Sequence, residues 1–319
     1  MNLHLNKDLF TEMIDTLNVR TGIAVDIIEK DYYVCLILMD IAKNQNETKA
    51  YFKGGTAIYK ILDEMNRFSE DIDLTVKVLK EDSNTKNRKR LKQSALGYEL
   101  EGLELLKDET IDNKGSVTGF YRYDSVFDMD QMPLHRAGKI QVESTSFTVS
   151  EPTEKYVIAP LIYQLATNRE KDILKEKFDV NEFEIEIIKL ERMFIDKLFA
   201  AEFYYIREMY TDTVKHLYDI TNLYRNEKIK EFLKNADEVK RLVEYKRQEE
   251  LVRKGGIDSK TKIVDFSYFK QEFNDELLKE FDNMQNKYVL NEKYKIDIEE
   301  VKKTLNEIVK NENIAEISG

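Results

Sequence analysis

The hydrophobic pattern changes its period between Phe52 and Lys77, and this change constrains the fold more than any other feature. The stretch reads FKGGTAIYKILDEMNRFSEDIDLTVK. After the glycine pair, apolar residues recur every three or four positions, as on one face of a helix. In DIDLTVKV the period falls to two, which is typical of a half-buried strand. With KAYFK as a short first strand, the region is predicted to fold as strand, glycine turn, helix and strand.

The glycine turn is the first candidate binding element. Gly54 and Gly55 end the first strand, and Thr56 is the expected N-cap of the helix. A helix N-terminus leaves unpaired backbone N–H groups, and glycines keep side chains out of the space before them. Such a space suits phosphate. A lone Gly-Gly pair is more often a simple turn.

The strand after this helix carries two acids. Asp71 and Asp73 are two positions apart, so they lie on one face of the strand. Carboxylates that close repel each other unless a cation lies between them, and Mg²⁺ bridges carboxylates to substrate phosphates. A D-x-D strand alone is more often the solvated face of a sheet. The ordered combination of glycine turn, helix and D-x-D strand favours a site for a triphosphate and magnesium.

A two-metal site needs a third carboxylate, because both ions require ligands. Glu143 in GKIQVESTSF is the preferred candidate, since it lies in a clean alternating pattern. Asp124, Asp128 and Asp130 in YDSVFDMDQ are alternatives.

Glycine and proline are distributed unevenly, and this indicates two domains. All three prolines lie at or before residue 160, and the only later glycines are Gly255, Gly256 and Gly319. Residues 7–42 have helical spacing, and SVTGFYRY and KIQVESTSF read as strands. The predicted fold class is therefore α+β, with a mixed domain over residues 1–165 and an α-helical domain over residues 166–319.

The net charge of −11 argues against a surface uniformly coated for nucleic acid, although a local basic track is compatible with it. KNRKRLK contains five basic residues, which are Lys86, Arg88, Lys89, Arg90 and Lys92. A solvated helix end and a contact with RNA phosphates are both open interpretations of this run.

Few residue types remain for other chemistry. Cys35 is the only cysteine and lies in an apolar setting, so it is expected to be a buried structural thiol. Three histidines argue against a zinc cluster. The chain lacks an apolar run of roughly 20 residues and an apolar leader. A cytoplasmic location is therefore expected.

The helical half contains one unusual lysine. Lys197 in LERMFIDKLFAAEFYY is expected to have apolar or small neighbours on its helix face. Its ammonium group must find an anion or extend outward to solvent. Further along, Asp219 follows Lys215 and His216 in VKHLYDI, which alone would read as a charged helix face.

These motifs together resemble those of the AbiEii/AbiGii abortive-infection toxin-like nucleotidyltransferases. The resemblance is carried by FKGGTAIYK, RFSEDIDL, a VE strand, ERMFIDKL and KHLYDI in this order, and EKDYYVCLIL looks like the family's N-terminal helix. It extends from about Glu29 to about Ile220.

The resemblance implies a polymerase-β-like nucleotidyltransferase fold with a mixed sheet, followed by a helical domain that contributes to the active site. The residues carried over are Gly54, Gly55, Thr56 and Ser69 for the nucleotide, Asp71, Asp73 and Glu143 for the metal, Lys197 for the phosphates and Asp219 as a further polar residue. Relatives often have arginine where this chain has Lys215, which keeps the charge but loses the planar fork.

The implied activity is transfer of a nucleoside monophosphate from an NTP to RNA, with tRNA as the expected acceptor, two Mg²⁺ ions as cofactors and a cognate antitoxin encoded in the same operon. Such a toxin would block growth or phage propagation. Two alternatives stay open. A kinase could use the same pocket, with Ser69 as a target, or the fold could be a catalytically inactive binding module.

Overall fold

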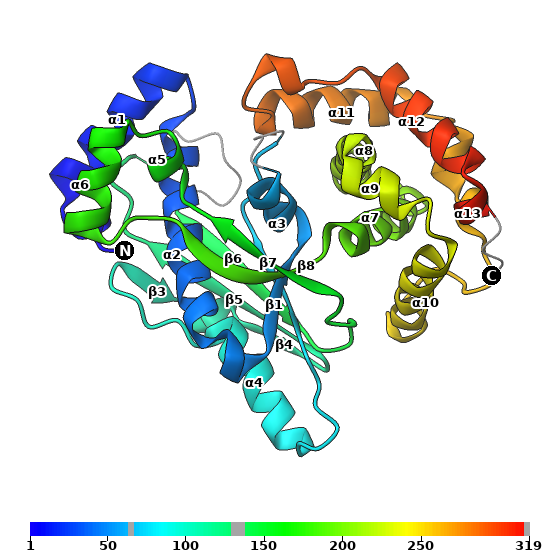
Figure 1. Cartoon of the computed structure of the whole chain (residues 1–319), viewed down its shortest axis with the longest axis horizontal. Coiled ribbons are helices and arrows are strands. Elements are labelled where there is room, and N and C mark those ends of the chain that lie inside the picture. Colours follow the sequence, from blue (N-terminus) through cyan, green and yellow to red (C-terminus); the bar gives the residue numbers. More distant parts are fainter. Residues whose placement is uncertain (63–66, 129–137, 316–319) are drawn as a thin grey trace. The chain divides into compact units, whose positions relative to one another are not determined.

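The computed structural model describes the chain except for residues 63–66, 129–137 and 316–319. The described chain forms two compact units (Figure 1). The first unit comprises Met1–Glu64, Phe68–Ser146 and Thr153–Ile187. The second comprises Met65–Arg67, Phe147–Pro152 and Ile188–Gly319.

The first unit is built on a mixed sheet. Its described strands are β1 (Ala50–Lys53), β2 (Ile72–Val76), β3 (Leu103–Leu105), β4 (Ile111–Asn113), β5 (Ser116–Tyr123), β6 (Lys139–Thr145), β7 (Thr153–Ile158) and β8 (Phe183–Ile188). They are ordered β3-β5-β6-β2-β1-β8-β7, and β4 pairs with β5. β2 is antiparallel to β1 and parallel to β6, while β8 is parallel to β1. The expected mixed sheet is confirmed.

Helices of the first unit pack with this sheet. They are α1 (Lys7–Thr21), α2 (Val25–Thr48), α3 (Gly54–Ile61), α4 (Asn84–Leu96), α5 (Leu161–Gln164) and α6 (Asn168–Phe178), with short 3₁₀ turns at Leu3–Leu5 and Lys107–Glu109. Every residue of α2 from Asp26 to Met39 is buried. A helix buried on all sides belongs to the core rather than to the surface. The helical pattern predicted over residues 7–42 is confirmed by α1 and α2.

The second unit is helical, as predicted. Its described helices are α7 (Leu190–Tyr205), α8 (Tyr210–Arg225), α9 (Glu227–Phe232), α10 (Ala236–Val252), α11 (Asp275–Tyr288), α12 (Ile298–Lys310) and α13 (Glu312–Ala315). Short 3₁₀ turns lie at Ile263–Asp265, Ser267–Lys270 and Glu292–Tyr294. Asparagine or aspartate side chains cap several of these helices, for example Asn235 and Asn274. Side-chain caps fix where such helices begin.

The strand predictions for SVTGFYRY and KIQVESTSF are confirmed by β5 and β6. β8 lies in a region predicted to be helical, and that prediction is wrong there. Scarcity of glycine and proline suggested helix, but FEIEII alternates with the period of a strand. Residues 166–187 belong to the first unit, so the observed division follows Ile187 rather than residue 165.

The prediction of Thr56 as N-cap is also wrong. α3 begins at Gly54, its N-cap is Lys53, and that residue makes no side-chain capping hydrogen bond. The Thr56 hydroxyl is used elsewhere, as described below. Among the described helices, none is both long and apolar enough to cross a membrane.

Candidate active site

The glycine turn and the acidic strand lie next to each other in the first unit. β1 leads into α3, and β2 returns antiparallel to β1 with Asp73 opposite Lys53. On its other side, β2 is parallel to β6 and places Asp73 beside Glu143. Paired residues of neighbouring strands project to the same face of a sheet. The predicted third carboxylate therefore lies next to Asp73.

Gly54 is in direct contact with Asp73. Its φ is +84°, and a Cβ built on it would lie 2.1 Å from Asp73 Oδ2. No side chain fits at that distance, and φ in this range favours glycine. Glycine at this position therefore allows the Asp73 carboxylate to lie against the first residue of α3.

Thr56 links the first turn of α3 to the other predicted aspartate. Its buried Oγ1 donates a hydrogen bond to the backbone carbonyl of Asp71 at 2.5 Å. This bond fixes the segment that enters β2 against the start of α3, where Gly55 also lies. The Thr56 hydroxyl therefore bonds to the segment before β2 and, contrary to the sequence prediction, does not cap its own helix.

Asp71, Asp73 and Glu143 are half-buried. Their carboxylate oxygens are hard donors of the type that Mg²⁺ prefers, so the residue types fit this ion. Within the part of the chain that the structure describes, however, no three His, Cys, Asp or Glu side chains are grouped to hold a metal ion. Oxygen atoms of a bound phosphate would have to supply further ligands.

The alternatives for the third carboxylate are placed differently. Asp124 is exposed and forms an ion pair with Lys7. Asp128 is also exposed, and Asp130 lies outside the described residues. Ser69 is half-buried two positions before Asp71. Only Glu143 of the described candidates is in register with Asp73.

The second unit contains a cluster around Asp219 in α8. Lys197 Nζ in α7 lies 2.8 Å from Asp219 Oδ2. Arg67 binds the same carboxylate with two hydrogen bonds of 2.7 Å, from Nε to Oδ1 and from Nη2 to Oδ2. All three side chains are buried. The question that the sequence raised about Lys197 is answered, because its ammonium group pairs with a buried anion.

Burial alone would raise the pKa of Asp219, but Arg67 and Lys197 outweigh it and hold that pKa well below its usual range. The pKa of the neighbouring His216 is lowered too, but for a base this favours the neutral form. Burial, reinforced by the charge of Lys197, lowers the pKa of His216 well below its usual value. The imidazole is therefore neutral, and it stacks on Tyr204 with ring centroids 5.3 Å apart.

Sequence reasoning missed the role of Arg67. The residue opens the quoted RFSEDIDL motif, but it lies 152 positions from Asp219. No periodicity links positions so far apart. A buried bidentate arginine is a geometric finding that only the fold reveals.

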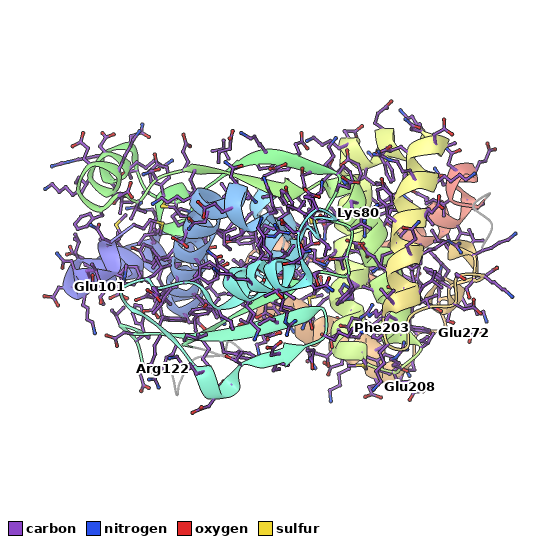
Figure 2. The ribbon with its side chains drawn as sticks, turned by 90° about the horizontal axis from the view of Figure 1, so that it is seen from below. Lys80, Glu101, Arg122, Phe203, Glu208 and Glu272 are labelled. Carbon is purple, nitrogen blue, oxygen red and sulfur yellow. The ribbon has the colours of Figure 1, made fainter. Side chains whose placement is uncertain are left out.

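The basic run lies in α4, and four of its five basic residues form ion pairs within the first unit. Lys86 and Arg90 pair with Asp82, and Arg88 and Lys92 pair with Asp112. Arg90 is buried. Arg122, another exposed basic residue of the first unit, is labelled near the lower edge of the ribbon in Figure 2. The structure thus gives Arg88 and Arg90 structural partners, and RNA contact stays a prediction.

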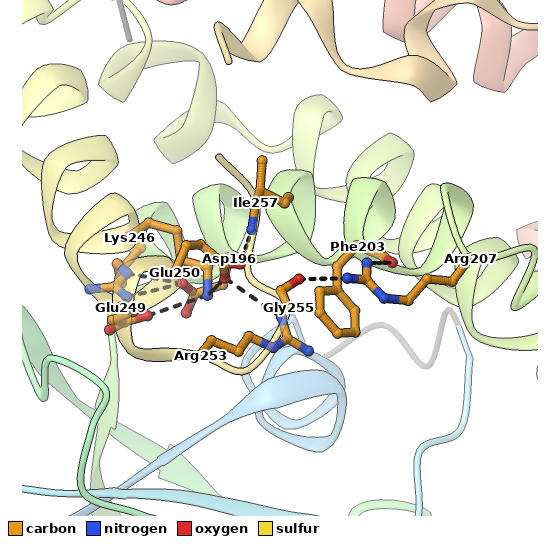
Figure 3. A network of polar contacts seen from close by, with 10 residues as sticks. Asp196, Phe203, Arg207, Lys246, Glu249, Glu250, Arg253, Gly255 and Ile257 are labelled. Carbon is orange, nitrogen blue, oxygen red and sulfur yellow. Dashed lines mark hydrogen bonds and ion pairs between the residues drawn. The ribbon is translucent and has the colours of Figure 1, made fainter. Parts of the chain in front are cut away.

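A further buried polar network lies in the second unit, between α7 and α10 (Figure 3). Arg192 Nη2 lies 3.0 Å from Asp196 Oδ1 and 2.6 Å from Glu249 Oε1. Lys246 lies 2.9 Å from Glu250 Oε1. Glu250 also accepts the backbone N–H of Ile257 at 3.0 Å. These charges pair with one another, and the bond from Ile257 fastens the chain after α10, so we assign the network to stability.

Comparison with known proteins gives one family match. Residues 36–309, more than half of the chain, match the family model described as nucleotidyl transferase AbiEii toxin of the type IV toxin–antitoxin system. Among solved structures, the chain is similar to MenT4, a nucleotidyltransferase toxin from Mycobacterium tuberculosis H37Rv. That similarity has 13% identity and a TM-score of 0.46, and it covers 92% of this chain and 97% of MenT4. No curated protein matches by sequence.

Proposed function

Because the chain belongs to the AbiEii family of nucleotidyltransferase toxins, we propose that it transfers a nucleoside monophosphate from an NTP to an RNA acceptor, and that the acceptor is tRNA. The contact between Gly54 and the Asp73 carboxylate supports this most directly. It brings the start of a helix, which suits phosphate, next to an oxygen donor that suits a divalent ion.

The residues of α3 would bind the triphosphate. Backbone N–H groups at Gly54, Gly55 and Thr56 belong to the first turn and attract anions. Ser69 is proposed as a further nucleotide contact. These groups also offset the charge that develops on the leaving pyrophosphate.

Asp71, Asp73 and Glu143 would hold two Mg²⁺ ions together with phosphate oxygens. When bound, such ions lower the pKa of an attacking hydroxyl and stabilise the leaving group. The protein's own contribution is to fix the carboxylates. Asp73 is held by the β1–β2 and β2–β6 register, and Asp71 is held through Thr56.

In the second unit, we propose that Lys197 contacts the nucleotide phosphates. Asp219 would then be the residue that orients Lys197, with Arg67 completing the charge balance of the cluster. We also propose a cognate antitoxin encoded in the same operon, in keeping with the type IV toxin–antitoxin description of the family.

The experiment is incubation with each α-³²P-labelled NTP, Mg²⁺ and total RNA. The wild-type chain is expected to label one RNA size class, and Asp73→Ala is expected to lose the labelling. Glu184→Gln is the matched control, because Glu184 is an exposed acid of β8 that pairs with Lys155. Equal labelling by the wild type and Asp73→Ala would contradict the proposal.

The products also separate the alternatives. Nucleotidyl transfer releases pyrophosphate, whereas a kinase would release a nucleoside diphosphate and label a protein with γ-phosphate. Phosphate found on Ser69 by mass spectrometry, with diphosphate as product, would favour the kinase. Triphosphate binding without either product would indicate the inactive module.

A further inference from the structure

Three consecutive charged residues lie in the second turn of the buried helix α2. Glu29 has a relative exposure of 0%, and Lys30 and Asp31 each have 1%. Charged side chains are almost never fully buried unless they are paired. Their partners therefore show what the run EKD does.

Asp31 holds α3. Its Oδ1 lies 2.5 Å from Lys60 Nζ and accepts a hydrogen bond of 3.0 Å from the hydroxyl of Tyr59. Its Oδ2 accepts the backbone N–H of Leu161 at 2.6 Å. Lys60 also donates to the carbonyl of Ala159 at 3.1 Å. The last turn of α3 is thus tied to α2 and to the start of α5.

Lys30 holds the segment that enters β2. Its Nζ lies 2.5 Å from Glu70 Oε2, and the two side chains are only 1% and 11% exposed. Glu70 immediately precedes Asp71. Phe68 in the same segment packs edge-on against Tyr59 of α3, with ring centroids 5.8 Å apart.

Glu29 holds a third segment, which follows β5. Its carboxylate accepts hydrogen bonds from Ser125 Oγ at 2.6 Å and from the Val126 backbone N–H at 2.8 Å. Successive residues of an α-helix point about 100° apart, so three neighbours can reach three separate segments. One turn of α2 thereby contacts α3, the entry to β2 and the segment after β5.

We propose that Lys30 and Asp31 form a positioning platform that fixes the phosphate-binding helix α3 and the metal-binding segment at Asp71 relative to each other, and that Glu29 anchors the same turn of α2 to the segment after β5. These are positioning residues that act through their partners. The inference rests on the proposed function for its catalytic consequences. The proposal predicts that the two ion pairs affect different steps. The pair with Lys60 holds the phosphate-binding helix and should affect triphosphate binding, whereas the pair with Glu70 holds the metal-binding segment and should affect the chemical step.

The test uses two double variants in the full chain. Removing one partner of a buried ion pair leaves an uncompensated charge, whereas neutralising both partners is much milder, so paired changes protect the fold. Lys30→Met/Glu70→Met removes the tie at Asp71. Asp31→Asn/Lys60→Met removes the ion pair at α3. The single amide oxygen can still accept the Leu161 N–H, and the amide NH2 can donate to the hydroxyl oxygen of Tyr59.

The expected results divide between KM and kcat. Lys30→Met/Glu70→Met should lower kcat by about tenfold or more, with KM for the triphosphate nearly unchanged, because small displacements of reacting groups cost about that much. Asp31→Asn/Lys60→Met should raise that KM by about tenfold, with a smaller change in kcat. Arg20→Gln, which removes an ion pair with Glu170 between α1 and α6, is the control and should change neither.

Hydrogen–deuterium exchange supplies a readout that needs no activity. The variant at Lys60 should exchange faster in residues 54–61, and the variant at Glu70 should exchange faster in residues 68–73, each by about tenfold. Identical losses of kcat and KM in both variants, or unchanged local exchange, would overturn the inference. A wild-type chain that transfers no nucleotide would instead refute the proposed function, and exchange would still decide the positioning role.

Discussion

The two units hold the carboxylates that we propose for the active site in different ways. In the first unit, Asp71 immediately precedes β2 and Asp73 lies in it, and both are half-buried. The contact with Gly54 brings Asp73 to a helix N-terminus. In the second unit, Asp219 is buried and its oxygens are bound by Arg67 and Lys197. A half-buried carboxylate retains access for a ligand, whereas one saturated by internal cations mainly orients those cations. The first arrangement suits metal binding, and the second suits positioning of Lys197.

Outside the carboxylates themselves, the largest expected effect on activity is that of Gly54→Ala. The added methyl group would meet Asp73 Oδ2 at 2.1 Å, so either α3 or the carboxylate must move. We expect nucleotide transfer to fall by about 100-fold or more, measured as kcat/KM for the triphosphate. Gly22→Ala is the matched control, because Gly22 also has a positive φ of +73° but a methyl group added there would meet nothing within 4 Å. If both variants lose activity equally, backbone strain rather than contact with Asp73 is responsible.

Replacing aspartate by asparagine should lower the free energy of unfolding much more at Asp219 in the second unit than at Asp71 in the first. Asp219→Asn leaves Arg67 and Lys197 buried without their anion, and we expect the free energy of unfolding to fall by about 3–5 kcal/mol. Asp71→Asn should cost less than about 1 kcal/mol, because that side chain is half-buried, yet it should abolish transfer. Urea denaturation with an activity assay measures both. Equal destabilisation by the two changes would remove the contrast between the units.

The sequence predicted the placement of residues in the first candidate site better than in the second, for a physical reason. Asp71, Asp73 and Gly54 lie close together in the chain, and local periodicities of 3.6 and 2 determine which face each residue occupies. Arg67 and Asp219 meet only through tertiary packing, and hydrophobic periodicity carries no signal for such a pair. The same limit applies to Thr56, whose hydroxyl bonds to Asp71 across the fold rather than to its own helix.

At β8, the composition predicts a helix but the structure contains a strand. The lack of glycine and proline after residue 160 suggested helix, but FEIEII pairs with β1 as a strand of the first unit. The alternating pattern was visible there and should outweigh composition. The charged run Glu29, Lys30 and Asp31 is also recognisable in the sequence, because it interrupts an otherwise apolar helix. Its partners were not predictable, because they come from three other segments.

The pH dependence of stability should also distinguish the units. Burial is the main cause that raises the pKa of Glu29 from 4.5 to about 7, so its contribution is full below pH 4.5 and is lost as pH rises through 7. The loss is about 3 kcal/mol. The pKa of Asp219 is lowered, so its contribution is present above its usual value of 3.8 and is lost only as pH falls below that value.

Glu29→Gln tests this expectation by urea denaturation between pH 5 and pH 8. The variant should show a flatter profile than the wild type, because the amide does not ionise. The charges of Asp26 and Asp124 also act on Glu29 and raise its pKa further. A profile unchanged by the substitution would contradict the assignment of this pH dependence to Glu29.

The smallest expected effect concerns the basic run of α4. Lys89 is exposed and takes part in none of the ion pairs formed by the described residues, so it can be reversed without breaking such a contact. If the run contacts RNA, Lys89→Glu should weaken RNA binding and leave nucleotide binding unchanged. The slope of the logarithm of the RNA binding constant against the logarithm of salt concentration should become shallower by about 1. Fluorescence anisotropy at several salt concentrations measures this. Unchanged affinity at low salt would remove Lys89 from the RNA surface.

Metal-dependent binding of a triphosphate tests the central claim most directly, namely that the glycine turn and the acidic strand form one site. Isothermal titration of a non-hydrolysable NTP with and without Mg²⁺ should show binding to the wild type that is strengthened by the ion. Asp73→Asn should lose this strengthening, while Glu184→Gln should keep it. Binding to Asp73→Asn that responds to Mg²⁺ as fully as binding to the wild type would contradict the account.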